Sequence, residues 1–355
     1  MSTPAKKKTV ILITVICLVV IGFASAVRVS SSDRTCVTCH EIRPAHEMWA
    51  QSSHRDAPCV ECHGSILSNG WHSLWENTRK LAGHFAATSP EDIRMTEEHV
   101  AEMIIRCKRC HEREYAGWLA SGHSLTYADV LLNEKHNREE QLNDDCLRCH
   151  CMFYEGRIED IVTPISIQGP WKLTKRELSR RPAIPCLACH EIHLKGNPAT
   201  RPDYADPKTI ASRRDLRPPK LSFYDRREKA YFAAALLPEP GVAEGDRLIG
   251  MAPDNRQRVC VQCHAPNGRH ESATADDRTP KGVHEGLSCI ACHAIHSLET
   301  RRSCAECHPS LSNCGRDVEK MDTTYFAPVS RQNIHFVKCA DCHVKGVPAR
   351  RKRAS

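Results

Sequence analysis

The hydrophobic pattern of this chain has one dominant feature, an uncharged apolar run from Thr9 to Val27 that directly follows Lys6–Lys8. A run of this length is just sufficient to span a bilayer as a helix. The preceding lysines would keep the short N-terminus, residues 1–8, on the inner side. A cleaved secretory signal is the alternative, because Ala24–Ala26 resembles a signal-peptidase site. The pattern therefore predicts a membrane anchor or a signal segment over residues 9–27.

Beyond this run the chain is polar, with short helical patterns separated by coil. Helices are expected over His72–Ala87 and Glu97–Ile105, and a further helix over Tyr224–Leu237 that ends at the following proline. The segment Ile158–Leu173 predicts a short strand or loop, and the stretch 191–259 is rich in proline and predicts turns. We therefore expect a mainly α protein with extensive coil and little sheet.

Composition adds a difficulty for such a fold. Aromatic residues make up 5% of the 355 residues, whereas cysteine and histidine each occur 21 times. A chain so poor in large apolar side chains has little material from which to build a core. Something other than side chains must supply the buried apolar volume.

The cysteines and histidines follow one repeated pattern, Cys-x-x-Cys-His, which occurs nine times. Eighteen of the 21 cysteines belong to it, so a disulfide framework does not explain the cysteine content. The cysteine pairs are Cys36 and Cys39, Cys59 and Cys62, Cys107 and Cys110, Cys146 and Cys149, Cys186 and Cys189, Cys260 and Cys263, Cys289 and Cys292, Cys304 and Cys307, and Cys339 and Cys342. Their histidines are His40, His63, His111, His150, His190, His264, His293, His308 and His343.

This pentapeptide is the attachment site of a c-type haem. Its two thiols bind the two vinyl groups of one porphyrin, and the adjacent imidazole binds the iron. Zinc is the alternative, since paired cysteines also build zinc ribbons, but zinc does not require a histidine directly after every pair. The sequence thus predicts nine covalently bound haems c, around which the polypeptide wraps as a stacked array. The porphyrins would then supply the missing core.

Twelve further histidines are available as second axial ligands for nine irons. A histidine very close to one motif is better placed to reach the iron of a neighbouring haem than to fold back onto its own. The distal ligands expected on this basis are His54, His193, His284, His296 and His335, and His84, His123, His136 and His270 are added to complete the set. The remaining three are His46, His72 and His99.

Charge and attachment chemistry limit the possible partners and location. The formal net charge is +7, but each haem would bring two propionates, and together these outweigh it. The basic sequence is therefore no argument for nucleic-acid binding. Covalent haem attachment takes place outside the cytoplasm, so we expect a periplasmic haem region, either anchored to the inner membrane or secreted after signal cleavage.

Two segments of the chain echo each other. A haem motif at Cys36 is followed by Trp49 and a Ser-x-His ending at His54, and a motif at Cys107 is followed by Trp118 and a Ser-x-His ending at His123. Repeated units of this kind are expected where neighbours bury their cofactors jointly.

The N-terminal part, from the anchor through the motifs at Cys36, Cys59 and Cys107 to His150, resembles the NapC/NirT family of membrane-anchored tetrahaem quinol dehydrogenases, which includes the small membrane subunit of cytochrome c nitrite reductase. In that family a methionine often stands two residues after the first motif histidine, whereas this chain has Ile42 there. The resemblance implies a tetrahaem module over residues 28–155, and we expect a pentahaem module over 156–355 with a haem-free, proline-rich excursion at 191–259.

These features together predict an electron-transfer protein of anaerobic respiration. It would take electrons from the membrane menaquinol or quinol pool and deliver them to a periplasmic or outer-surface acceptor, with periplasmic or outer-membrane redox proteins as partners. Such a protein has possible quinol dehydrogenase activity. The alternatives are a multihaem reductase of nitrite, hydroxylamine or sulfur oxyanions, which needs an iron with an open face, and a soluble electron-wire cytochrome.

Overall fold

The computed structural model describes residues 4–30, 32–64, 82, 95–193, 221–239, 241–264, 278–293, 295–296, 335 and 338. The chain divides into two units. The first comprises Met1–Cys110 with Ile192–Gly196, and the second comprises His111–Glu191 with Asn197–Ser355. Helix and coil dominate the described part of both units, and sheet is limited to short hairpins. This agrees with the helical class expected from the sequence.

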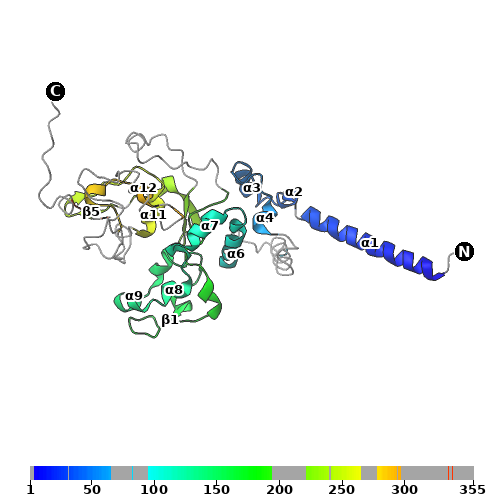
Figure 1. The fold of residues 1–355 in the computed structure, drawn as a ribbon, viewed down its shortest axis with the longest axis horizontal. Helices are drawn as coiled ribbons and strands as arrows, with labels where there is room; N and C mark the ends of the chain where they lie inside the picture. Colours follow the sequence, from blue (N-terminus) through cyan, green and yellow to red (C-terminus); the bar gives the residue numbers. More distant parts are fainter. Residues whose placement is uncertain are drawn as a thin grey trace, which may run out of the picture. The chain divides into compact units, whose positions relative to one another are not determined.

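The first unit begins with α1 (Pro4–Ser30), the dark-blue helix of Figure 1. Its segment Lys8–Val29 is long and apolar enough to cross a membrane. Leu12 and Val19 on this helix are 60% and 65% exposed, so its apolar side chains have no protein packed over them. An exposed apolar surface of this size is typical of a membrane contact. The helix expected over Thr9–Val27 is confirmed.

The rest of the first unit consists of short helices. They are α2 (Asp33–Cys36), α3 (Arg43–Ala50), α4 (Cys59–His63) and α6 (Glu97–Lys108). The Thr96 hydroxyl caps α6 by accepting the backbone N–H of His99 at 3.4 Å. The helix expected over Glu97–Ile105 is thus confirmed and extends one turn further, where it contacts α4. The helix expected over His72–Ala87 falls, except for Ala82, outside the described residues.

The second unit consists of short helices and short hairpins (Figure 1). Its α-helices are α7 (Glu112–Leu119), α8 (Tyr127–Leu131), α9 (Glu134–Glu139), α11 (Gln257–His264) and α12 (Cys289–Cys292). Its 3₁₀ helices are η1 (Gly122–Ser124), η2 (Asp144–Arg148), η3 (Ile158–Asp160), η4 (Arg176–Arg180), η5 (Cys186–Ala188), η7 (Ala234–Leu236) and η9 (Gly282–His284). Its strands are β1 (Val162–Thr163), β2 (Lys172–Leu173), β3 (Ser222–Asp225), β4 (Ala230–Ala233), β5 (Ala243–Glu244) and β6 (Arg247–Leu248).

A side-chain core forms in the second unit around α8, η2 and the β1–β2 hairpin. Tyr127, Leu131, Leu147 and Ile161 are almost fully buried there. Cys151, one of the three cysteines outside the motifs, is fully buried in the same cluster and has a positive φ of 58°. Val162 pairs with Leu173 across the hairpin, so the strand expected within Ile158–Leu173 is confirmed.

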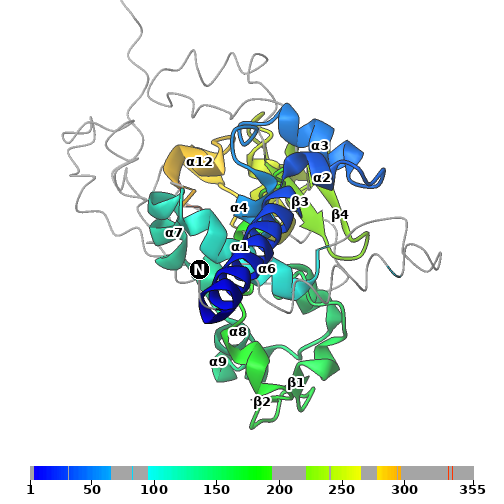
Figure 2. The same cartoon turned by 90° about the vertical axis from the view of Figure 1, so that its right-hand side faces the viewer.

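The helix expected over Tyr224–Leu237 is wrong. This segment forms the antiparallel β3–β4 hairpin, labelled in Figure 2, followed by the single turn η7. Tyr224 pairs with Tyr231 across the strands, and the aromatic side chains of both strands suit a pleated surface better than a helix. The hairpin also lies against a haem motif, because Ser222 donates its backbone N–H to the carbonyl of Cys189 at 3.1 Å.

Candidate haem-binding site

The described motifs lie on short helical turns. The motif at Cys59 occupies all of α4, the motif at Cys260 ends α11, and the motif at Cys289 forms α12. Positions i, i+3 and i+4 of a helix share one face. One turn therefore presents both thiols and the following imidazole to the same side, as attachment to a single porphyrin requires.

Four motifs depart from this arrangement or cannot be placed. In the first motif α2 ends at Cys36, and in the motif at Cys107 α6 ends at Lys108, so Cys39 and Cys110 lie in the turns that follow these helices, where both are exposed. The two last motifs lie outside the described residues, and their attachment residues stay predictions from the sequence. These residues are Cys304, Cys307 and His308, and Cys339, Cys342 and His343.

Four motif histidines face a second histidine from elsewhere in the chain. In the first unit the ring centroids of His63 and His193 lie 6.2 Å apart, with ring planes at 30°. In the second unit the corresponding separations are 5.8 Å for His190–His296, 6.1 Å for His123–His264 and 6.1 Å for His293–His335.

This spacing is the one expected of two imidazoles that share an iron. A metal–nitrogen bond of about 2 Å on each side of the ion places the two ring centroids roughly 6 Å apart. Within the described residues, no group of three or more His, Cys, Asp and Glu side chains gathers as a metal site. Paired imidazoles beside paired thiols are the donor set that suits a porphyrin iron, since the macrocycle provides the other four nitrogens. The residues present therefore fit a haem.

All four second histidines belong to the set expected as distal ligands. His193 and His296 each stand three residues after a motif histidine, and each faces the histidine of a different motif. His335 stands four residues before Cys339 and faces His293. The sequence alone did not predict which histidines face each other, because the partners are separated by 42 to 141 positions along the chain.

The structure places the other expected ligands as follows. His54 lies in the turn after α3, His136 lies within α9 with its Nε2 3.7 Å from Glu140, and His284 ends η9. His84 and His270 lie outside the described residues. Of the three histidines left over, His46 packs on Trp49 at 5.1 Å and His99 contacts Thr96, whereas His72 is not described.

The thiols of neighbouring motifs lie near one another in the first unit. Cys36 shares a hydrogen bond with Cys59, and Cys62 lies beside Cys107. Burial raises the pKa of Cys59 to about 12, with a further contribution from Asp33. The motifs at Cys36, Cys59 and Cys107 therefore follow one another in space as they do in the sequence.

The second unit brings motifs together in another order. The thiol of Cys263 shares a hydrogen bond with Cys149, and that of Cys260 shares one with Cys289. Cys189 lies beside Cys260 as well. The motif at Cys260 is thus next to the motifs at Cys146, Cys186 and Cys289, and it forms the centre of the cluster.

Desolvation lowers the pKa of the His123, His293 and His296 imidazoles. For His123 and His293 the neighbouring His264 lowers the pKa further. These imidazoles are therefore neutral at pH 7, and the neutral form is the one that carries a lone pair for a metal.

Tryptophan side chains hold the chain just before two motifs. Trp49 Nε1 donates to the carbonyl of Ala57 at 3.1 Å, and Trp118 Nε1 donates to the carbonyl of Ile184 at 3.0 Å. Each carbonyl is followed by a proline and then by the first cysteine of a motif, Cys59 or Cys186. The sequence echo therefore corresponds to a shared contact, which the spacing alone did not reveal.

A buried ion pair connects the motifs at Cys260 and Cys289. Arg256 Nε lies 2.9 Å from Asp254 Oδ1, with the side chains 6% and 1% exposed. Ser288, the residue before Cys289, donates its hydroxyl to the same carboxylate at 2.9 Å. The buried Asp254–Arg256 pair was not predictable from the sequence, because nothing in the segment 254–256 differs from an ordinary polar loop.

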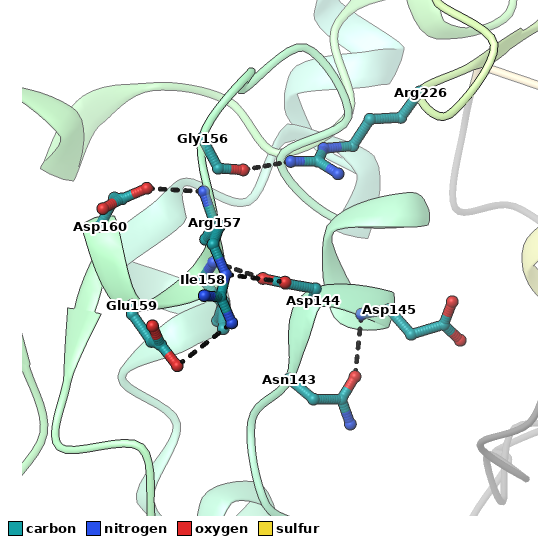
Figure 3. A network of polar contacts seen from close by, with 9 residues as sticks. All are labelled: Asn143, Asp144, Asp145, Gly156, Arg157, Ile158, Glu159, Asp160 and Arg226. Atoms are coloured by element: carbon teal, nitrogen blue, oxygen red, sulfur yellow. Dashed lines mark hydrogen bonds and ion pairs between the residues drawn. The ribbon is translucent and has the colours of Figure 1, made fainter.

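A polar network fixes the loop that follows the motif at Cys146 (Figure 3). The Asp144 carboxylate accepts the backbone N–H of Ile158 at 2.8 Å and the Nε of Arg157 at 3.3 Å. Arg226, in the turn of the β3–β4 hairpin, donates to the carbonyl of Gly156. It also donates to the carbonyl of Tyr154. The hairpin thus holds the loop in place, and the loop in turn supports η2 and its motif.

Comparisons with known proteins agree with these features over parts of the chain. Residues 247–309 match the cytochrome c3 family and residues 106–163 match the cytochrome c554 and c-prime family. The cytochrome c-type protein NrfH of Wolinella succinogenes is 25% identical over 143 residues, which cover 37% of this chain and 73% of that protein. The cytochrome c-type protein TorY of Haemophilus influenzae is 23% identical over 168 residues, covering 39% and 42%.

No solved structure gives a significant match to the chain. The matching families and the two relatives are all c-type cytochromes. Together with the repeated Cys-x-x-Cys-His motif, they identify this chain as a multihaem c-type cytochrome with NapC/NirT-like relatives.

Proposed function

We propose that this chain binds nine haems c and transfers electrons from the membrane quinol pool, through successive haems, to a periplasmic or outer-surface acceptor. Each Cys-x-x-Cys-His motif would hold one haem through its two thiols and its histidine. Haem iron, when bound, alternates between its ferric and ferrous states and so accepts and releases one electron at a time.

The observation that carries this proposal is the set of four histidine pairs at 5.8–6.2 Å. In the proposal, His193, His296, His123 and His335 are the second ligands of the haems at Cys59, Cys186, Cys260 and Cys289. An iron with two protein imidazoles has no open position for a substrate. The four paired sites therefore favour electron transfer over catalysis.

The entry point for electrons rests on the first unit. The exposed apolar helix α1 would anchor the chain in the inner membrane, and the motif at Cys36 follows it directly. The similarity of the N-terminal part to membrane-anchored quinol dehydrogenases supports quinol as the donor. The hydrogen bond between Cys36 and Cys59 and the proximity of Cys62 to Cys107 support a continuous path within this unit.

The number of haems is tested by intact-mass measurement of the purified holoprotein. A mass that exceeds the polypeptide mass by nine haems is expected. The same spectrum decides whether residues 1–26 are retained, because cleavage after Ala26 would remove the anchor. A mass with fewer haems would contradict the assignment of the missing motifs.

Electron entry is tested by mixing the oxidised, detergent-solubilised protein with a menaquinol analogue without oxygen, and by following the haem α-band. Rapid reduction of the haems is expected. If the analogue reduces nothing while dithionite reduces all haems, the quinol role is wrong and the chain is a downstream carrier. A high-spin haem that binds nitrite or hydroxylamine would instead favour the reductase alternative.

A further inference from the structure

Helix α7 approaches one distal histidine more closely than a side chain allows. A methyl group placed on Gly117, within α7, would overlap the backbone carbonyl oxygen of His296 and would lie 2.6 Å from its carbonyl carbon and 3.3 Å from its Cβ. Glycine is the residue that permits such an approach of two backbones. The histidine brought close in this way is the one whose ring faces His190 at 5.8 Å.

The next residue of the helix reaches the other side of the same pair. Trp118 donates its indole N–H to the carbonyl of Ile184 at 3.0 Å, two residues before Cys186. The turn that starts at Cys186 carries His190. Adjacent positions of one helix therefore contact the backbone that carries each of the two facing imidazoles.

We propose that Gly117 is a positioning residue, which sets the distance and orientation of the His296 imidazole relative to the iron of the haem at Cys186. Trp118 fixes the opposite side of the same site. This inference rests on the proposed function, because it takes His190 and His296 as the axial ligands of one haem. Any side chain at position 117 pushes the His296 backbone outward and lengthens or breaks its bond to the iron.

The test compares Gly117→Ala with Gly122→Ala in the full-length holoprotein. Gly122 lies in η1, five residues further on, and a methyl group there meets no atom within 4 Å. Alanine is a better helix former than glycine, so Gly117→Ala does not weaken α7 itself. We expect Gly117→Ala to convert one haem per molecule from low-spin to high-spin, visible in the ferric EPR spectrum, and to shift the potential of one haem. Gly122→Ala should leave both unchanged.

Two further variants separate the possible failures. His296→Ala should produce the same single high-spin haem, and added imidazole should restore the low-spin signal. In a His296→Ala background, Gly117→Ala should have no additional effect on spin state, because it acts through that imidazole. If His296→Ala leaves all haems low-spin, the ligand assignment in the proposed function is wrong. If His296→Ala gives the high-spin haem but Gly117→Ala does not, the ligand assignment stands and the positioning role is overturned.

Discussion

The two units hold their haem motifs by contacts of different kinds. In the first unit Trp49 binds a carbonyl 8 positions further along the chain, and Arg109 forms an ion pair with Glu61 in which both side chains are more than half exposed. In the second unit Trp118 binds a carbonyl 66 positions away. One ion pair of that unit, Arg256 with Asp254, is buried.

The difference follows from how each unit is connected. Motifs that are consecutive in the sequence are also neighbours in the first unit, so contacts between consecutive motif segments, such as that of Arg109 with Glu61, join them. The second unit assembles motifs from distant segments around Cys260, and the contacts that join them include the buried Asp254 carboxylate, which accepts from Ser288. The same Trp-x-x-Ser-x-His segment therefore serves as a local turn in one unit and as a tertiary connection in the other.

Disrupting the Asp254–Arg256 and Glu61–Arg109 ion pairs should give the largest difference in unfolding free energy between the units. Asp254→Ala removes the carboxylate from beside the buried Arg256 guanidinium, and removal of one member of a buried pair costs about 3–5 kcal/mol of unfolding free energy. Glu61→Ala, in the exposed pair, should cost at most about 1 kcal/mol. Guanidinium unfolding of both holoprotein variants, followed by the Soret band, measures the difference. Equal costs would show that burial does not distinguish the units.

The buried pair should also respond to acid. Burial alone would raise the pKa of Asp254, but the Arg256 guanidinium and the Ser288 hydroxyl more than offset it and hold the pKa below the ordinary value of a carboxyl group. The stabilisation is therefore fully present above pH ~4, the unfolded pKa, and is lost as the pH falls through the lower folded pKa. Unfolding free energy measured from pH 6 down to pH 2 should fall more steeply in the native protein than in Asp254→Asn, and parallel curves would contradict this.

The two tryptophans should differ less than the ion pairs. Trp118→Phe removes the indole N–H and leaves the Ile184 carbonyl without that donor, which costs about 1–2 kcal/mol. Trp49→Phe loses an equivalent hydrogen bond, but its 8-residue loop remains closed by neighbouring backbone bonds, so its cost should be smaller. Thermal unfolding of the pair of variants measures this. A larger loss in Trp49→Phe would reverse the comparison.

The smallest difference between the units should come from the serines of the repeated segment, whose substitution should cost the same in both. The Ser52 hydroxyl accepts the backbone N–H of His54 at 3.0 Å, and that of Ser121 accepts the N–H of His123 at 3.2 Å. Ser52→Ala and Ser121→Ala should each cost about 1 kcal/mol. A clear difference between the two variants, measured by chemical denaturation, would mean that the local turn is not shared.

Local patterns predicted the elements that depend on neighbouring residues. The apolar run predicted α1, and the amphipathic sequence after Thr96 predicted α6. The hairpin over Ser222–Ala233 was not predicted, because its apolar spacing also fits a helix. The cross-strand pairs of Phe223 and Tyr224 that distinguish a hairpin form only when the two strands meet. The sequence pattern did not single out Gly117, because its close contact is with the backbone of His296, a residue far along the chain.

The sequence by itself determined the chemistry of this protein, because each Cys-x-x-Cys-His motif carries its thiols and its imidazole within five consecutive residues. It also determined the pool of candidate second histidines. The tertiary structure alone decided that His193 faces His63 and that His123 faces His264. Such pairs depend on how separate segments pack, and residues 130 or 141 positions apart share no local geometry from which a pairing could be inferred.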